Sequence, residues 1–360
     1  MNGSLLMSRM RHLLGRDQNL AILVGLTVLV FVVLVPVLGT RFIAEANLQS
    51  MATQVAEFGL LALAMGLAML LGGIDLSIVS AAVLSAVVGA RFLRGDFIPL
   101  TESNQSTVMV IGIVAMLVTG MLTGLVNGTL IAKFSVPPIL ATLGTYILFS
   151  GISTITTDAR AVSVAVGDYS DIAVITVADV PLIFVLMIVV YLVVALFLRR
   201  TRTGRRIYLY GENNVALRFT GARNERLIIS TYLLIGLIAG LAGLIMSSRA
   251  NGIKVGYGDT YLLQAILVVV LAGFNPYGGR GRVASLLIGL VMLQSLQSAF
   301  TIMQFDPFMK KFIWGAMLLA VMAVNFVVNR RAAAKARAVG THDTSPTPPS
   351  TTRVPAGVAA

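Results

Sequence analysis

The stretch L-G-G-I-D-L-S-I, residues Leu71–Ile78, interrupts apolar sequence with two glycines and a carboxylate. Backbone N–H and C=O groups exposed by such a break find no water inside a bilayer. They are tolerated at membrane depth only where protein or a water-lined cavity satisfies them. The break therefore predicts a functional site inside a membrane protein rather than a lipid-facing surface.

The composition around this stretch is that of a polytopic membrane protein. Of the 360 residues, 57% are hydrophobic and 12% are charged, and the mean hydropathy is +0.90. In soluble domains about a quarter of the residues are charged. The chain has no cysteine, which excludes disulfides and thiolate metal sites. The formal charge of +12 comes largely from arginines at 199–226 and after Asn329. This clustering follows the positive-inside rule, so the charge indicates membrane topology and not a nucleic-acid partner.

Ten apolar runs predict an all-α fold of about ten transmembrane helices. The first run follows Arg9, Arg11 and Arg16, is too long for a signal peptide and is expected to remain as an uncleaved helix. An even number of spans with basic flanks places both termini in the cytoplasm. The runs are 20–38, 51–71, 76–91, 107–132, 137–157, 180–198, 228–248, 260–273, 283–303 and 310–328.

Three regions follow from these runs. Residues 1–19 form a cytoplasmic N-terminal segment, residues 20–329 the transmembrane domain with a cytoplasmic loop at 199–227, and residues 330–360 a basic and then disordered cytoplasmic tail. The end of the tail is rich in Pro, Thr and Ser and has too little apolar content to pack.

A second interruption resembles the first one. The short run that ends near residue 272 continues as A-G-F-N-P-Y-G-G-R-G-R before a helix resumes. Downstream of each break a proline starts a helix that contains a glycine, at Val136 and at Asp306. We infer two halves of five helices, which an odd number of spans would orient oppositely, as in inverted-repeat transporters. The alternative is that glycine breaks and proline starts recur by chance in a ten-helix protein.

The residue types indicate transport and not catalysis. There is no phosphate-binding loop and no H-E-x-x-H metal motif, and the two histidines, His12 and His342, lie in the terminal segments. Few ionisable groups lie in the spans, chiefly Glu57, Asp75 and Asp259. Uncharged polar side chains are more frequent, which suits a pathway for a neutral, hydroxylated solute. The alternative is that these side chains join helices.

The residues expected along the pathway belong to the two breaks and to the polar positions nearby. Asp75 has two readings: its carboxylate accepts hydrogen bonds from substrate hydroxyls, or it caps the helix that starts near Leu76. We favour the cap. The pathway residues are Gly72, Gly73, Asp75, Ser77, Asn127, Thr142, Thr145, Gln264, Phe274 and Asn275.

The arginine-rich loop contains a predicted short helix from Glu212 to Phe219. Val215, Ala216 and Phe219 form its apolar stripe, and Gly221 supplies the stop signal. Such a helix could lie on the bilayer or dock into a groove of a partner. Its brevity favours docking.

With these residues in place, the chain resembles the permease subunits of bacterial ABC importers for simple sugars, of the ribose, xylose, arabinose and autoinducer-2 type, within the branched-chain amino acid/sugar permease superfamily. Seven motifs carry the resemblance in order along about 290 residues. They are R-F-I-A-E-A-N-L-Q-S from Arg41, L-G-G-I-D-L-S from Leu71, G-L-V-N-G-T-L-I from Gly124, P-P-I-L-A-T-L-G-T from Pro137, T-G-R-R-I-Y-L-Y-G-E-N-N-V-A-L-R-F-T-G from Thr203, G-L-I-A-G-L-A-G-L-I from Gly236 and Y-G-G-R-G-R-V from Tyr277.

The resemblance implies an inner-membrane importer with several subunits. A permease pair, made of two copies or of this chain and a paralogue, would work with cytoplasmic ATPase subunits and a periplasmic sugar-binding protein. ATP and Mg would bind the ATPase, and this chain would bind no cofactor or metal. The residues expected to contact the ATPase are Glu212, Asn213, Ala216, Leu217, Phe219 and Gly221.

The chain departs from the family pattern at the two breaks. Ile78, Val79 and Ser80 replace V-G-S after the first break, and Gln264 stands where many relatives have an acidic residue. These differences leave the substrate open. The main hypothesis is alternating access driven by the partner ATPase. An ion-coupled secondary transporter is the alternative, and a membrane scaffold without transport has little use for paired breaks. Neighbouring genes for an ATPase and a secreted binding protein would discriminate among the three.

Overall fold

The structure of this chain is a computed structural model that describes residues 18–340. The predicted all-α, polytopic class is confirmed, because eight helices in this range are long and apolar enough to cross a membrane. Strands in the described part are limited to four of two residues each. β1 (Val162–Ser163) pairs antiparallel with β4 (Gly252–Ile253), and β2 (Thr176–Val177) with β3 (Val180–Pro181).

A helix occupies each of the ten predicted runs. α5 and α13, with 17 and 13 residues, are the shorter ones and flank the two breaks, α5 after the first and α13 before the second. The inverted relation between two five-helix halves stays a prediction. The ten helices are α2 (Gln18–Leu38), α4 (Glu45–Leu70), α5 (Ile78–Arg94), α6 (Gln105–Ala132), α7 (Pro138–Thr157), α9 (Leu182–Arg200), α12 (Asn224–Arg249), α13 (Asp259–Leu271), α14 (Val283–Ile302) and α15 (Pro307–Gly340).

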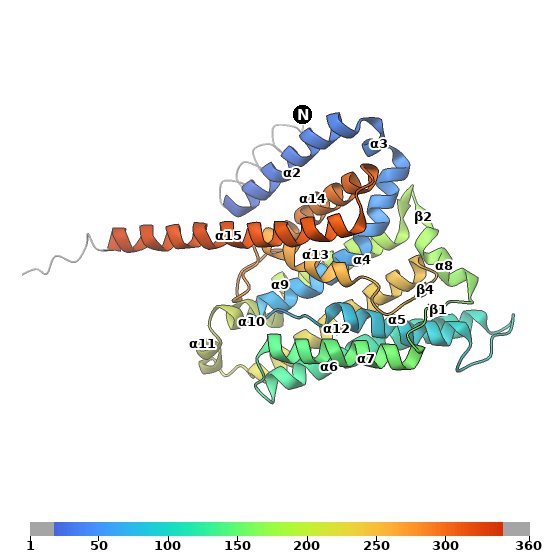
Figure 1. Cartoon of the computed structure of the whole chain (residues 1–360). Coiled ribbons are helices and arrows are strands. Elements are labelled where there is room, and N and C mark those ends of the chain that lie inside the picture. The colour runs from blue at the N-terminus through green and yellow to red at the C-terminus, as the bar shows by residue number, and fades with distance from the viewer. Residues whose placement is uncertain (1–17, 341–360) are drawn as a thin grey trace, which may run out of the picture. The chain divides into compact units, whose positions relative to one another are not determined.

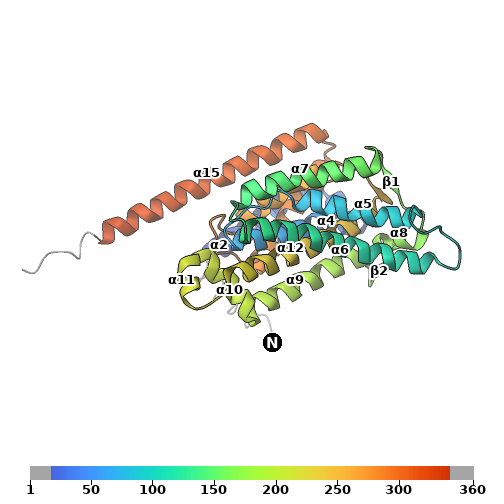
Figure 2. The same ribbon diagram turned by 90° about the horizontal axis from the view of Figure 1, so that it is seen from below.

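Short helices join the long ones. They are α3 (Thr40–Ile43), α8 (Gly167–Val174), α10 (Arg202–Glu212) and α11 (Asn214–Phe219). Figures 1 and 2 show α10 and α11 at one end of the helix bundle and β1, β2 and α8 at the other. We call these the coupling end and the far end.

The core lies around α4 and α12. α12 packs against α4, α5 and α6, and small residues allow the backbones to approach closely. A Cβ on Gly124 of α6, for example, would overlap the carbonyl oxygen of Tyr232 on α12. In contrast, α2 is largely exposed, as expected for a helix that faces lipid.

The described residues divide into two compact units, one up to Leu318 and one from Leu319 onward. Helix α15 continues to Gly340 and so includes the basic start of the predicted tail at residue 330. Most of the predicted N-terminal segment 1–19 and the remainder of the tail fall in residues 1–17 and 341–360, which lie outside the described residues.

Candidate functional site

The first break is a folded turn between α4 and α5 and is filled by protein. Gly72 has a φ of +81°, a backbone conformation that favours glycine, and a Cβ there would lie 2.9 Å from the carbonyl oxygen of Tyr277. A Cβ on Gly73 would lie 2.7 Å from the Cβ of Pro138. Both predicted glycines are therefore required by close contacts with other segments.

The Asp75 carboxylate is hydrogen-bonded to Ser77, two residues further along the chain. Its side chain is buried, and Oδ1 accepts hydrogen bonds from the backbone N–H of Ser77 at 2.8 Å and from the Ser77 hydroxyl at 2.7 Å. This is an Asx turn that leads directly into α5, which begins at Ile78 and not near Leu76. The geometry favours a role for Asp75 in capping the start of α5. The N–H that it binds belongs to Ser77, one residue before the helix.

A buried hydrogen-bond chain continues from this turn. The Asn127 side-chain Nδ2 donates to the Ser77 hydroxyl at 2.7 Å, and the Thr145 hydroxyl donates to the Asn127 side-chain Oδ1 at 2.7 Å. All of these side chains are buried. The chain joins the start of α5 to α6 and α7, so the structure brings together four residues that the sequence assigned to the pathway.

Thr142 satisfies the backbone of the same break. Its hydroxyl oxygen accepts a hydrogen bond from the Leu76 N–H at 3.1 Å and lies 2.8 Å from the Pro138 carbonyl, to which it donates. Polar backbone at membrane depth thus finds a protein partner, as the break requires.

Gln264, on α13, is buried but makes no hydrogen bond to this network within the described residues.

The second break, between α13 and α14, is also an ordered turn. Asn275 donates its N–H to the Arg280 carbonyl, and its Oδ1 accepts from the Tyr277 N–H at 3.0 Å. The Phe274 ring is buried against Gly66 of α4, where a Cβ would lie 3.2 Å from the ring. The two predicted residues of this break therefore shape the turn and anchor it to α4.

The two breaks meet each other and α10 at the coupling end. The Gly279 N–H donates to the Leu70 carbonyl, the last of α4, at 3.1 Å. A Cβ on Gly211 of α10 would overlap that same carbonyl and the Gly279 nitrogen, and a Cβ on Gly278 would lie 2.6 Å from the Gly211 Cα. We call Gly72, Gly211, Gly278 and Gly279 the glycine junction.

Side chains around the glycine junction add further links to α10. The Tyr208 hydroxyl donates to the Gly281 carbonyl at 3.1 Å, and the Arg280 guanidinium lies 3.4 Å from the Glu212 carboxylate. Burial raises the pKa of the Tyr208 phenol, so it remains a neutral donor. Tyr208, Gly211, Gly278 and Gly279 were not predicted from the sequence to be site residues. Their only signal was membership of the two motifs from Thr203 and Tyr277.

A cavity of about 660 Å³ opens beside the glycine junction. It lies between the first break, the α6–α7 turn, α10 and the start of α12, and its lining combines polar and apolar groups. Lining residues include Gly72, Pro138, Tyr210, Glu212, Asn224 and Tyr277. Any movement of α10 against the breaks would therefore change the shape of this cavity.

The predicted coupling helix needs one correction. Glu212 ends α10, and the short helix α11 begins at Asn214, because the Asn213 side chain accepts the Ala216 N–H at 2.9 Å and caps it. Gly221, with a φ of +74°, follows the end of α11 as predicted. Leu217 is buried, whereas Ala216 is exposed and Phe219 is 88% exposed. The predicted apolar stripe is therefore free to meet a partner.

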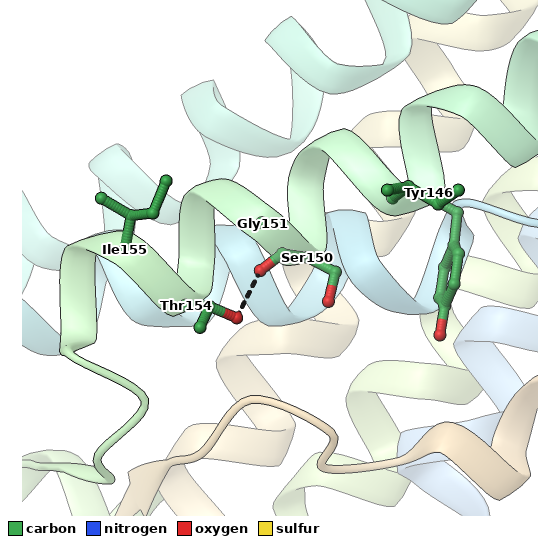
Figure 3. Close-up of a pocket in the computed structure, with 6 residues that line it drawn as sticks. Tyr146, Ser150, Gly151, Thr154 and Ile155 are labelled. Carbon is green, nitrogen blue, oxygen red and sulfur yellow. Dashed lines mark hydrogen bonds between the residues drawn. The ribbon is translucent and has the colours of Figure 1, made fainter.

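A shallow hollow of about 420 Å³ lies along one face of α7. Figure 3 shows Tyr146, Ser150, Gly151, Thr154 and Ile155 along this face, with the Thr154 hydroxyl bonded to the Ser150 carbonyl. α7 packs against α5 and α6 on its other side. The described residues contain no group of three or more His, Cys, Asp or Glu side chains that could hold a metal ion.

Comparison with known proteins gives a consistent result. Residues 47–322 match the family model described as branched-chain amino acid transport system, permease component. The ribose import permease protein RbsC of Bacillus subtilis is 29% identical over 317 residues, which cover 87% of this chain and 94% of that protein. The fructose import permease protein FrcC of Rhizobium meliloti is 28% identical over 342 residues, 91% of each chain.

A third relative extends the range of substrates. The autoinducer 2 import system permease protein LsrD of Photorhabdus temperata is 28% identical over 267 residues, 72% of this chain and 77% of that protein. No solved structure matches the chain. The relatives confirm the resemblance that the seven sequence motifs indicated.

Proposed function

Because this chain belongs to the family of branched-chain amino acid transport system permease components, we propose that it is the permease subunit of an ABC importer for a monosaccharide or a related small polyol. The observation that carries the proposal is the similarity over most of the chain to permeases named for ribose and fructose import. The uncharged polar groups at the breaks suit a neutral, hydroxylated solute. The chain would move this solute by alternating access and would hold no nucleotide itself.

Cytoplasmic ATPase subunits, with ATP and Mg bound to them, would supply the power. Their docking site is the coupling surface, which we define as Val215, Ala216 and Phe219 of α11. Phe219 and Val215 are 88% and 61% exposed, and arginines surround them in the sequence. A large exposed aromatic side chain on a short helix is typical of a partner contact. The glycine junction would carry the movement of α10 and α11 to both breaks.

A second permease copy, identical or a paralogue, would cover the exposed face of α7. Tyr146 and Ser150 are partly exposed on this membrane helix, where lipid would leave their hydroxyl groups without partners. A pathway between two copies would give these hydroxyl groups a role. The complex would lie in the bacterial inner membrane with both termini and α11 in the cytoplasm. A periplasmic sugar-binding protein would dock at the far end.

The experiment is co-purification of the ATPase with Phe219→Asp. The aspartate would place a charge at the centre of an apolar contact, so the variant should lose the ATPase and all nucleotide-dependent uptake while remaining inserted and folded. Phe97→Asp is the matched control, because Phe97 is 53% exposed at the far end. Retention of the ATPase by Phe219→Asp would refute the assignment of the coupling surface.

A further inference from the structure

A buried carboxylate with three donors lies apart from the two breaks. The Glu57 side chain on α4 has no exposed surface, and its Oε1 lies 2.9 Å from the Arg249 guanidinium. The Tyr257 hydroxyl donates to the same oxygen at 3.2 Å, and the Tyr261 hydroxyl donates to Oε2 at 2.5 Å. We call Glu57, Arg249, Tyr257 and Tyr261 the carboxylate clamp.

The clamp connects three segments near the far end. Arg249 ends α12, Tyr257 lies in the connection to α13, and Tyr261 lies in the first turn of α13. The same connection contains β4, whose two residues are buried and which pairs with β1 at the far end. The Arg249 side chain is 33% exposed, so the clamp extends from a partly exposed group at the end of α12 to a fully buried one on α4.

Helix α13 needs such an anchor because it is short. Its 13 residues extend for about 20 Å, less than the roughly 30 Å of a bilayer's hydrocarbon core. Burying an ionised carboxylate inside a membrane protein costs free energy unless the carboxylate is paired. Acidic residues at such positions are therefore rare and usually have a functional role. Ordinary apolar packing against α4 would hold α13 without this cost.

The other end of α13 is tied to α4 as well. The second break follows α13, and there the Gly279 N–H bonds to the Leu70 carbonyl while Phe274 packs on Gly66. From Glu57 to Leu70, α4 therefore runs beside α13 with a polar link at each end. At the coupling end, Gly211 of α10 packs closely against the Leu70 carbonyl and the Gly279 nitrogen that form this link.

We propose that the carboxylate clamp makes α4 and α13 move as one unit, which transmits docking of the binding protein at the far end to the glycine junction. Glu57 is then a positioning residue for import and contacts no substrate. This inference rests on the proposed function. Its specific content is that the clamp couples the two ends of the permease, beyond any contribution to stability.

The test uses the complete complex of permease, ATPase and binding protein in proteoliposomes. Basal ATPase activity, its stimulation by the binding protein and sugar uptake are measured for Glu57→Gln and Tyr261→Phe. Ser85→Ala is the control, since the buried Ser85 hydroxyl donates to the Ala81 carbonyl of its own helix α5, so the variant loses a hydrogen bond without breaking a link between helices. The ratio of stimulated to basal activity is the readout that a purely structural role would leave unchanged.

We expect Glu57→Gln to retain basal ATPase activity and to lose stimulation by at least about fivefold, the lower end of typical coupling factors. Tyr261→Phe keeps the ring and removes one hydrogen bond, so it should fold and show a smaller loss. Normal stimulation in Tyr261→Phe and in a folded Glu57→Gln would overturn the proposal. Should Glu57→Gln fail to fold, Tyr261→Phe alone decides. A wild-type complex without uptake or stimulation would instead refute the proposed function.

Discussion

The glycine junction offers the sharpest single substitution, Gly211→Ala. Gly211 lies in the last turn of α10, where alanine suits the helical backbone and would by itself stabilise the helix by at most about 1 kcal/mol. The space around it has the opposite effect. The added methyl group would overlap the Leu70 carbonyl and the Gly279 nitrogen, which are backbone atoms and cannot rotate away.

The magnitude follows from these contacts. Forcing a methyl group into packed backbone costs about 1–3 kcal/mol. Separation of the Gly279 N–H from the Leu70 carbonyl removes a buried hydrogen bond worth about 1 kcal/mol more. The helix-propensity gain offsets part of this, so the net destabilisation should be about 1–3 kcal/mol. The added methyl group would strain the backbone at the contact between α10 and the two breaks.

The assay compares Gly211→Ala with Gly25→Ala. Gly25 also lies in a helix, α2, but nothing surrounds the place where its Cβ would be. In detergent, Gly211→Ala should lower the apparent midpoint of thermal unfolding and Gly25→Ala should not. In proteoliposomes, Gly211→Ala should also reduce uptake per ATP hydrolysed. If Gly211→Ala had the stability and uptake of the wild type, the inference that close backbone contacts with both breaks exclude a side chain at position 211 would be wrong.

Two further predictions concern the first break. Asp75→Asn should retain folding and uptake, because an amide oxygen can still accept a hydrogen bond from the Ser77 N–H. Asp75→Ala removes this acceptor and should lower the free energy of unfolding by about 1–2 kcal/mol. A folded Asp75→Asn variant without uptake would instead assign the carboxylate to transport. Thr145→Val should cost about 1–3 kcal/mol in thermal unfolding, because it leaves the buried Asn127 oxygen without its donor. Thr156→Val on the exposed side of the same helix is the control and should change stability by less than about 0.5 kcal/mol.

Much of the fold could be predicted from the sequence because membrane helices are defined by apolar length. Ten runs gave ten helices, and glycine clusters marked both breaks. Asp75, Ser77, Asn127 and Thr145 were selected as polar residues in apolar surroundings, and the structure joins them in one hydrogen-bond chain. Buried polar groups at membrane depth need hydrogen-bond partners, so polar positions near a break are good candidates for such a network, although Gln264 does not join it.

The contacts between distant segments could not be predicted in this way. Gly211 was one glycine in a charged loop until the fold placed Leu70 and Gly279 against it. Glu57 was visible as an intramembrane acid, but its partner Arg249 is far away in the sequence. The predicted start of this helix was wrong by two residues, because Glu212 ends α10 and Asn213 caps α11 at Asn214.

Whether ATP drives this permease can be measured as sugar uptake into proteoliposomes that contain the permease with or without its ATPase. The binding protein, loaded with a radiolabelled monosaccharide chosen by a ligand screen, is placed outside and ATP inside. We expect uptake that requires ATP and both partners and that persists when ionophores collapse every ion gradient. Uptake by the permease alone, driven by an ion gradient, would contradict it and identify a secondary transporter.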